Sequence, residues 1–145
     1  MQQSCKMDKE TIYKNIRIQG GRITKIRKAI VQIIFASECL ISQADIISQL
    51  KVMKLYPDRS TLFRELLFLN KNNIVFKNTL LGIDYYEIQR DHHHHLVCIN
   101  CKTIEKFAIR ELSMVEEGNL IAKKRNFNII NHSLEFYGLC HNCSR

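Results

Sequence analysis

Two kinds of metal-binding residue stand side by side in the stretch HHHHLVCINC, which begins at residue 92. Four histidines lead into a Cys-x-x-Cys pair, Cys98 and Cys101, and a second such pair, Cys140 and Cys143, lies near the C-terminus. The histidine run is internal and flanked by sequence of ordinary complexity, so we interpret it as native sequence and not as a purification tag. Imidazoles and thiolates together favour metal binding.

The two cysteine pairs are separated by 38 residues. Each pair supplies two thiols from one tight turn, and two such turns can complete a tetrahedral zinc site that ties the chain together. A redox dithiol is the alternative interpretation. A disulfide scaffold is disfavoured because the sequence shows no secretion signal. Zinc held by four thiolates has no open position, so this pattern indicates a structural and not a catalytic metal.

The histidines are expected to divide between two places. Alternate side chains of a strand point to the same face, so His93 and His95 would share one face and His92 and His94 the other. Two imidazoles do not fill a coordination sphere, and further ligands are needed. The residues that could supply them are Glu87, Asp91, Glu105, Glu111, Glu116, Glu117 and His132. The alternative is a solvated polar strand end.

Charge divides the 145-residue chain into two halves. Residues 1–83 hold 14 Lys and Arg against 6 Asp and Glu, whereas residues 84–145 hold 8 of each, so the whole excess of +8 lies in the first half. This asymmetry favours a polyanion-binding half joined to a half with another task, against the alternative of a generally basic surface. No apolar run approaches a membrane span, and we expect a soluble, cytoplasmic protein.

Hydrophobic periodicity predicts an amphipathic helix over residues 8–18 and three further helices. Thr24 is the expected N-cap of KIRKAIVQIIFAS. Ser42 and Asp45 form an acidic capping box before the next helix, and Asp58 can cap RSTLFRELLFLNK. The side chains expected to face the core are Ile26, Ala29, Ile30, Ile33, Ile34, Ala44, Ile47, Leu50, Leu62, Leu66 and Leu69.

After the segment NKNN the period changes to that of strands. IVFKN and DYYEI are rich in β-branched and aromatic residues and are joined by a loop containing Gly82, which predicts a β-hairpin. Three helices followed by a hairpin form a winged helix, in which the last helix occupies the DNA major groove.

The second half is predicted to be α/β. HLVCI, TIEKFAI and FNIINHSLEFYG are the expected strands, and residues 111–125 the expected helix, with Leu112, Val115 and Ile121 as its buried positions. A sheet with exposed edges and one helix is a poor core for a monomer, which predicts dimerisation. The fold class is therefore α+β. The predicted boundary separates a winged-helix DNA-binding domain (1–89) from an α/β dimerisation and metal-binding domain (90–145).

In this order, the motifs resemble those of the ferric uptake regulator (Fur) family of bacterial metal- and peroxide-responsive repressors. RITKIRKAIVQII resembles the family's second helix and STLFRELLFL its ATVYRTL recognition helix. YYEIQRDHHHHLVCINC is similar to its histidine and cysteine block, and NHSLEFYGLCHNC to its H-x-L-x-x-YG-x-C-x-x-C ending. The resemblance covers nearly the whole chain after Gly20. It implies a homodimeric, sequence-specific DNA-binding repressor of metal homeostasis or oxidative-stress genes.

The resemblance also implies roles for individual residues. The four paired cysteines match structural zinc ligands. Glu87, His93 and His95 match a regulatory site for iron, zinc or manganese, and His92, His94 and His132 match a second site. Arg64 is the best candidate for a base or phosphate contact, and Phe63, in place of the family's Tyr, keeps an apolar contact to a thymine methyl group. The residues expected to contact DNA are Arg22, Lys25, Arg27, Arg59, Ser60, Thr61, Phe63 and Arg64.

Some positions depart from the family pattern. Leu40, with Cys39 beside it, stands where a histidine of the DNA-binding half usually completes the regulatory site. Lys106, with Glu105 beside it, stands where an acidic ligand is usual, and Lys102 replaces a glycine. These departures bear on whether metal gates DNA binding.

A different class of function is a metal-storage or thiol redox protein without DNA gating. It would use the histidines and thiols but leaves the basic winged helix unexplained. An enzyme is not expected, because no motif places a general base beside an open metal position.

Overall fold

The computed structural model describes residues 7–108, 112–130 and 132–145. The chain divides into two compact units, unit 1 ending at Asp91 and unit 2 beginning at His92. Within the described residues, no helix has the length and apolarity needed to cross a bilayer.

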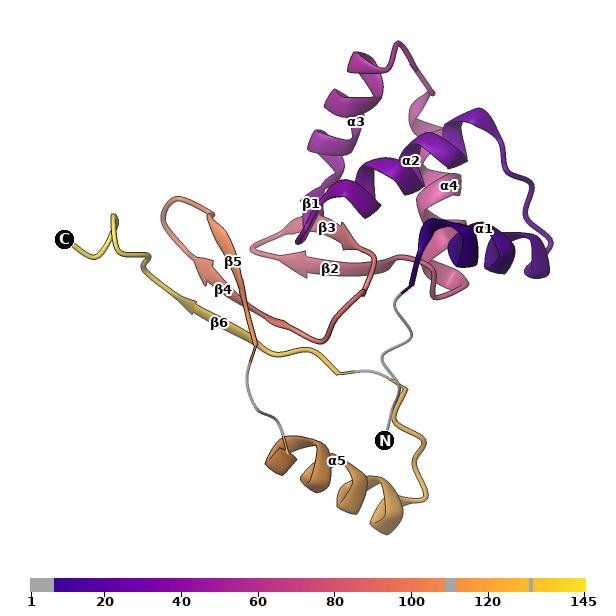
Figure 1. Ribbon diagram of the computed structural model, residues 1–145. Helices are drawn as coiled ribbons and strands as arrows, with labels where there is room; N and C mark the ends of the chain where they lie inside the picture. The colour runs from indigo at the N-terminus through magenta and orange to yellow at the C-terminus, as the bar shows by residue number, and fades with distance from the viewer. Residues whose placement is uncertain (1–6, 109–111, 131) are drawn as a thin grey trace. The chain divides into compact units, whose positions relative to one another are not determined.

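Unit 1 is a winged helix, as predicted, with helices packed on a three-stranded antiparallel sheet of order β1-β3-β2 (Figure 1). Strands β2 and β3 form the hairpin, and its two turn residues, Leu81 and Gly82, have φ of 51° and 77°, as tight hairpins require. The elements in chain order are α1 (Lys9–Ile18), α2 (Lys25–Ala36), β1 (Ile41–Ser42), α3 (Gln43–Val52), α4 (Arg59–Lys71), β2 (Phe76–Leu80) and β3 (Ile83–Glu87).

Each helix of unit 1 starts at a side-chain cap, which explains where it begins. Asp8 accepts a hydrogen bond from Thr11 N at 2.8 Å, and Thr24 accepts from Arg27 N at 3.1 Å. Ser42 and Asp58 cap α3 and α4 in the same way. The three predicted caps, Thr24, Ser42 and Asp58, are confirmed, because capping depends only on residues within one turn.

The core of unit 1 is an aliphatic cluster to which all four helices contribute. The predicted stripes of α2 and α4 are buried or partly buried, and the prediction for α3 needs one correction. Ala44 is exposed, and Ile46, 0% exposed, takes the inward position together with Leu50. Ile46 and Leu50 are four residues apart and stack on one face of α3, where they bury more apolar area than an alanine could.

Unit 2 holds a three-stranded sheet of order β5-β4-β6, in which β5 is antiparallel and β6 parallel to β4. The predicted strand FNIINHSLEFYG is shorter than expected, because only its last four residues pair with β4. Val115 and Ile121, expected to be buried, are 46% and 59% exposed. Glu111 and the Leu112 side chain lie outside the described residues. The elements are β4 (His94–Cys98), β5 (Ile104–Phe107), α5 (Leu112–Arg125) and β6 (Glu135–Gly138).

Candidate metal centres and DNA-binding surface

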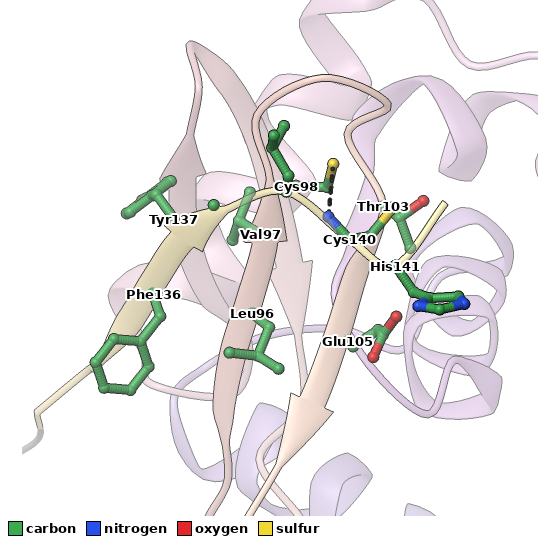
Figure 2. A pocket seen from close by; sticks show the side chains of 11 residues that line it. Leu96, Val97, Cys98, Thr103, Glu105, Phe136, Tyr137, Cys140 and His141 are labelled. Atoms are coloured by element: carbon green, nitrogen blue, oxygen red, sulfur yellow. Dashed lines mark hydrogen bonds between the residues drawn. The ribbon is translucent and has the colours of Figure 1, made fainter. Parts of the chain in front are cut away.

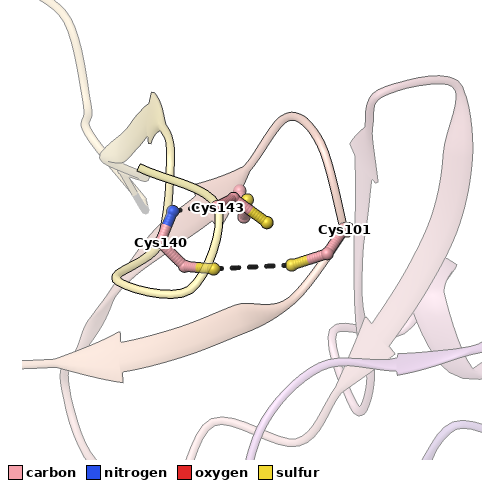
Figure 3. Close-up of side chains that lie close together, drawn as sticks. Cys101, Cys140 and Cys143 are labelled. Atoms are coloured by element: carbon pink, nitrogen blue, oxygen red, sulfur yellow. Dashed lines mark hydrogen bonds between the residues drawn. The ribbon is translucent and has the colours of Figure 1, made fainter. Parts of the chain in front are cut away.

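The four cysteines of unit 2 come together from two backbone turns. The first turn follows β4, where Lys102 N donates to the carbonyl of Cys98 at 3.0 Å. In the second, after β6, Cys143 N donates to the carbonyl of Cys140 at 3.0 Å. Because β6 runs parallel to β4, its end carries the second turn to the first (Figure 3). The four sulfur atoms all lie within 4.8 Å of one another.

The spacing of the sulfurs fits a closed zinc site. The Cys101 and Cys140 sulfurs are 3.6 Å apart (Figure 3). Tetrahedral zinc, with Zn–S bonds of about 2.3 Å, separates its sulfurs by about 3.8 Å. The hydroxyl of Thr103 lies 3.1 Å from the Cys101 sulfur, a neighbour that sequence analysis missed although it stands only two residues further on.

The thiols of this cluster differ in acidity. Hydrogen bonds from the backbone N–H of Cys140 and then of Cys101 lower the pKa of Cys98 to about 6. A hydrogen bond from the backbone N–H of Cys143 also lowers the pKa of Cys140. This effect is outweighed by the neighbouring thiols of Cys101 and Cys143 and by burial, which raise the pKa of Cys140 to about 11. The cluster therefore holds protons at neutral pH that a divalent cation would displace.

The histidines separate into two groups in unit 2, as the strand alternation predicts. The ligand nitrogens of His92, His94 and His132 all lie within 4.8 Å of one another, so these three residues could hold a metal ion. The rings of His93 and His95 lie together with centroids 5.0 Å apart. The metal-binding roles of both groups stay predictions.

Burial controls the protonation state of the His95 imidazole. His95 is 3% exposed. Its pKa is lowered to about 4, first by desolvation and then by the charges of His93 and His94. The ring is therefore neutral at physiological pH and retains the lone pair that metal coordination requires.

The other residue predicted for the regulatory site belongs to unit 1. Glu87 is the last residue of β3 and is 5% exposed. The side-chain amide of Asn78, across the hairpin on β2, donates to its Oε1 at 3.5 Å. Glu105 and Lys106, the acidic and the basic residue that stand near the family's usual acidic ligand, both lie on β5. In the register of the sheet, Glu105 stands opposite Leu96 of β4 and Lys106 opposite His95.

The α4 helix of unit 1 presents a basic and aromatic face opposite its buried leucines. Arg59, Ser60 and Arg64 are exposed, and Phe63 is 62% exposed. Arg64 donates to the hydroxyl of Thr61 at 3.4 Å, a long bond within one turn. The structure thus brings together the residues of α4 predicted to contact DNA. Arg22 and Lys25, also exposed, lie before and at the start of α2.

Arg27, which is predicted to contact DNA, has partners within unit 1, and its DNA contact stays a prediction. Its guanidinium pairs with Glu65 of α4 at 2.6 Å and 3.2 Å and lies 4.1 Å from the ring of Phe68. Its side chain is only 11% exposed. Sequence analysis missed Glu65 and Phe68 as partners, because no local pattern pairs residues 38 positions apart.

A shallow hollow lies on one face of the unit 2 sheet (Figure 2). Leu96 and Phe136 form its apolar part, and Glu105 and His141 flank the cysteine turns. Leu96 and Phe136 are 43% and 49% exposed, so an apolar strip of this sheet is open in the single chain.

A winged helix with an exposed basic helix, followed by an α/β unit with a four-thiol metal centre, defines a class of metal-linked DNA-binding regulators. A profile of the ferric uptake regulator family matches residues 18–137. The chain belongs to the ferric uptake regulator family and is a transcriptional regulator of that type.

Individual relatives agree with this assignment. The Ferric uptake regulation protein of Bacillus subtilis (strain 168) is 28% identical over 141 residues, which cover 93% of each chain. The structure of Helicobacter pylori Fur, described as revealing three functional metal binding sites, has a TM-score of 0.77 at 25% identity, covering 97% of this chain and 96% of that chain. The crystal structure of Vibrio cholerae Fur has a TM-score of 0.71 at 27% sequence identity, covering 88% of this chain and 98% of that chain.

Proposed function

We propose that this protein is a homodimeric repressor that binds double-stranded operator DNA sequence-specifically and controls metal homeostasis or oxidative-stress genes. The observation that carries the proposal is the exposed face of α4, where Phe63 and Arg64 stand free of the core on a winged helix. The half of the chain that contains α4 also holds the whole net charge of +8.

Recognition would combine two kinds of contact. Arg64 can donate to a guanine edge or a phosphate, and Phe63 can pack against a thymine methyl group in the major groove. Arg59, Ser60 and Thr61 lie at the N-terminal end of α4, where the exposed Arg59 guanidinium could donate to a phosphate. Arg22 and Lys25 would add phosphate or minor-groove contacts, which set the register without reading sequence.

Metal would have two roles. Zinc on Cys98, Cys101, Cys140 and Cys143 would be structural, because four thiolates close its coordination sphere. We infer that the histidine groups, with Glu87, hold regulatory iron, zinc or manganese. Such a metal helps DNA binding only if the DNA-competent form binds it more tightly than the other form does. Leu40 cannot bind a metal. Either Cys39 replaces the missing ligand and metal gates DNA binding, or the protein binds DNA without a regulatory metal.

The second unit would form the dimer. On α5, Leu120 and Ile121 are 58% and 59% exposed, and Ile130 beyond it is 83% exposed. Apolar surface of this extent is costly in water and is typical of an interface. A second copy of the chain is the partner that we propose for it.

Replacing Arg64 tests the proposed recognition helix. Arg64→Ala should weaken binding of the full-length protein to a selected duplex roughly five- to 150-fold, because one good base contact contributes about 1–3 kcal/mol. Fluorescence anisotropy titrations at several salt concentrations measure this, and the affinity should fall steeply with salt. Arg125→Ala, an equal loss of charge on α5, is the matched control and should bind almost as the wild type. Equal losses in the two variants would reject α4 as the recognition helix.

Metal storage or thiol redox chemistry without DNA gating is the second candidate function. It would leave the winged helix of unit 1 and the exposed arginines of α4 without a task. The protein is therefore proposed to act as a regulator and not as an enzyme. Action on chromosomal DNA would place it in the cytoplasm.

A further inference from the structure

The loop between α1 and α2, which carries Arg22, is held at three points. Its start is a Schellman turn: Gly20, with φ of 77°, donates to the carbonyl of Arg17, and Gly21 donates to the carbonyl of Ile16 at 2.8 Å. Further along, the carbonyl of Arg22 accepts a hydrogen bond from Nη1 of Arg27 at 2.9 Å. The backbone that presents the Arg22 side chain is therefore fixed before any DNA arrives.

The third point is a close approach at Gly21. A Cβ at this position would lie 2.5 Å from the ring of Phe68, 2.8 Å from the Arg27 guanidinium and 2.8 Å from the buried side chain of Ile16. Gly21 therefore lets the loop touch a side chain of α4 directly. The ring it touches is the one on which the Arg27 guanidinium lies, 4.1 Å from its centroid.

One guanidinium thus joins two elements that are expected to contact DNA. Its Nε and Nη2 donate to Glu65 of α4, and its Nη1 donates to the loop at Arg22. Glu65 directly follows Arg64, and Glu65 and Phe68 are three residues apart, on one side of α4. A planar guanidinium can make all of these contacts at once, whereas an ammonium cannot match the bidentate fork.

We propose that Arg27 is a positioning residue that, through Glu65 and Phe68, fixes the spacing between the Arg22 loop and the recognition helix α4. This inference rests on the proposed DNA-binding function. Arg27 acts on DNA binding through the positions of Arg22 and Arg64. It does not itself contact a phosphate. Glu65, although acidic and in the DNA-binding unit, supports DNA binding because it holds Arg27. Fixing the two contact elements in advance lowers the ordering cost of binding.

Whether DNA affinity rises or falls when Glu65 loses its charge separates this proposal from simple electrostatics. Removing a negative charge from a surface near a polyanion strengthens binding, and Glu10→Gln on α1, which makes the same charge change, should do so or leave affinity unchanged. Glu65→Gln should instead weaken binding about tenfold, the scale of coupling within a hydrogen-bonded network. The probe is a duplex selected by the wild-type protein from a random-sequence pool, with affinity measured by anisotropy and folding by circular dichroism.

A second variant keeps the charge and changes only the geometry. Arg27→Lys retains a cation for any phosphate contact, and under the proposal it still loses affinity because it cannot span Glu65 and Arg22 together. In an Arg22→Ala background the loss caused by Arg27→Lys should shrink, because the contact that it positions is already absent.

The outcomes are distinct. Weaker binding by folded Glu65→Gln and Arg27→Lys, with Glu10→Gln at least as tight as the wild type, supports the proposal. Wild-type affinity in either folded variant overturns it. If the wild-type protein selects no duplex from the pool, the proposed function itself fails and the positioning role fails with it.

Discussion

Arg27 and Glu65 form an ion pair that is largely withdrawn from water, with side chains 11% and 14% exposed. The same contacts that orient the loop also contribute to the stability of unit 1, and the two effects have different signatures. Binding geometry depends on the arrangement of the pair, whereas stability depends on whether a charge is left without its partner.

Arg27→Met should therefore lower the free energy of unfolding by about 3 kcal/mol, because it leaves the Glu65 carboxylate in a poorly solvated position. The double variant Arg27→Met with Glu65→Met should recover most of this loss, since neither charge then remains. Urea denaturation followed by circular dichroism measures both. If the double variant is as unstable as the sum of the two single variants, the pair does not act as a unit.

At the scale of elements, the parallel pairing of β6 with β4 places the two cysteine turns side by side. This pairing is short, from His95–Glu135 to Cys98–Gly138, and the cysteine centre lies at its end. A metal there would hold the chain segment after α5 against β4, so its removal should loosen the whole sheet of unit 2.

Cys143→Ser tests this role of the cysteine centre. The wild-type protein should contain about one zinc ion per chain, and the variant should lose it, because a serine hydroxyl is a poor replacement for a thiolate ligand. Elemental analysis measures the zinc, and amide hydrogen exchange should show lost protection in β4 and β6. His141→Asn, in the same turn, is the control and should keep its zinc. A zinc-free variant with unchanged protection would contradict the structural role.

The sequence predicts these elements well where the signal is local and poorly where it is not. Thr24 and Ser42 start helices as predicted because a cap needs only the next turn. The strand before Glu135 is over-predicted, because alternation alone cannot show where a pairing partner ends. Ile46 in place of Ala44 on α3 reflects a choice between two apolar stripes that only the assembled core decides.

The candidate site shows the same division. The cysteine centre follows from two motifs, and the grouping of the histidines follows from strand alternation. Arg27 is predicted to contact DNA, and its partners Glu65 and Phe68 on another helix could not be predicted from the residues around it. The fold, and not the local sequence, determines which basic residues remain available to DNA.

At the scale of the whole molecule, the exposed apolar side chains of α5 predict a dimer. Ile121→Glu should convert the protein to monomers, because a buried unpaired charge at an interface is strongly unfavourable. Sedimentation equilibrium measures the mass. Asn119→Glu, at an exposed polar neighbour on the same helix, adds the same charge and should leave the dimer intact. Dimers in both variants would show that this face of α5 lies outside the interface.

The central claim is that the protein recognises particular DNA sequences. It is tested most directly by competition: full-length wild-type protein bound to a labelled duplex, selected from a random-sequence pool, is titrated with unlabelled duplex of the same or of scrambled sequence. We predict that the scrambled duplex competes about a thousandfold or more less well at physiological salt. Equal competition by the two duplexes would contradict the account, because charge alone would then explain all of the binding.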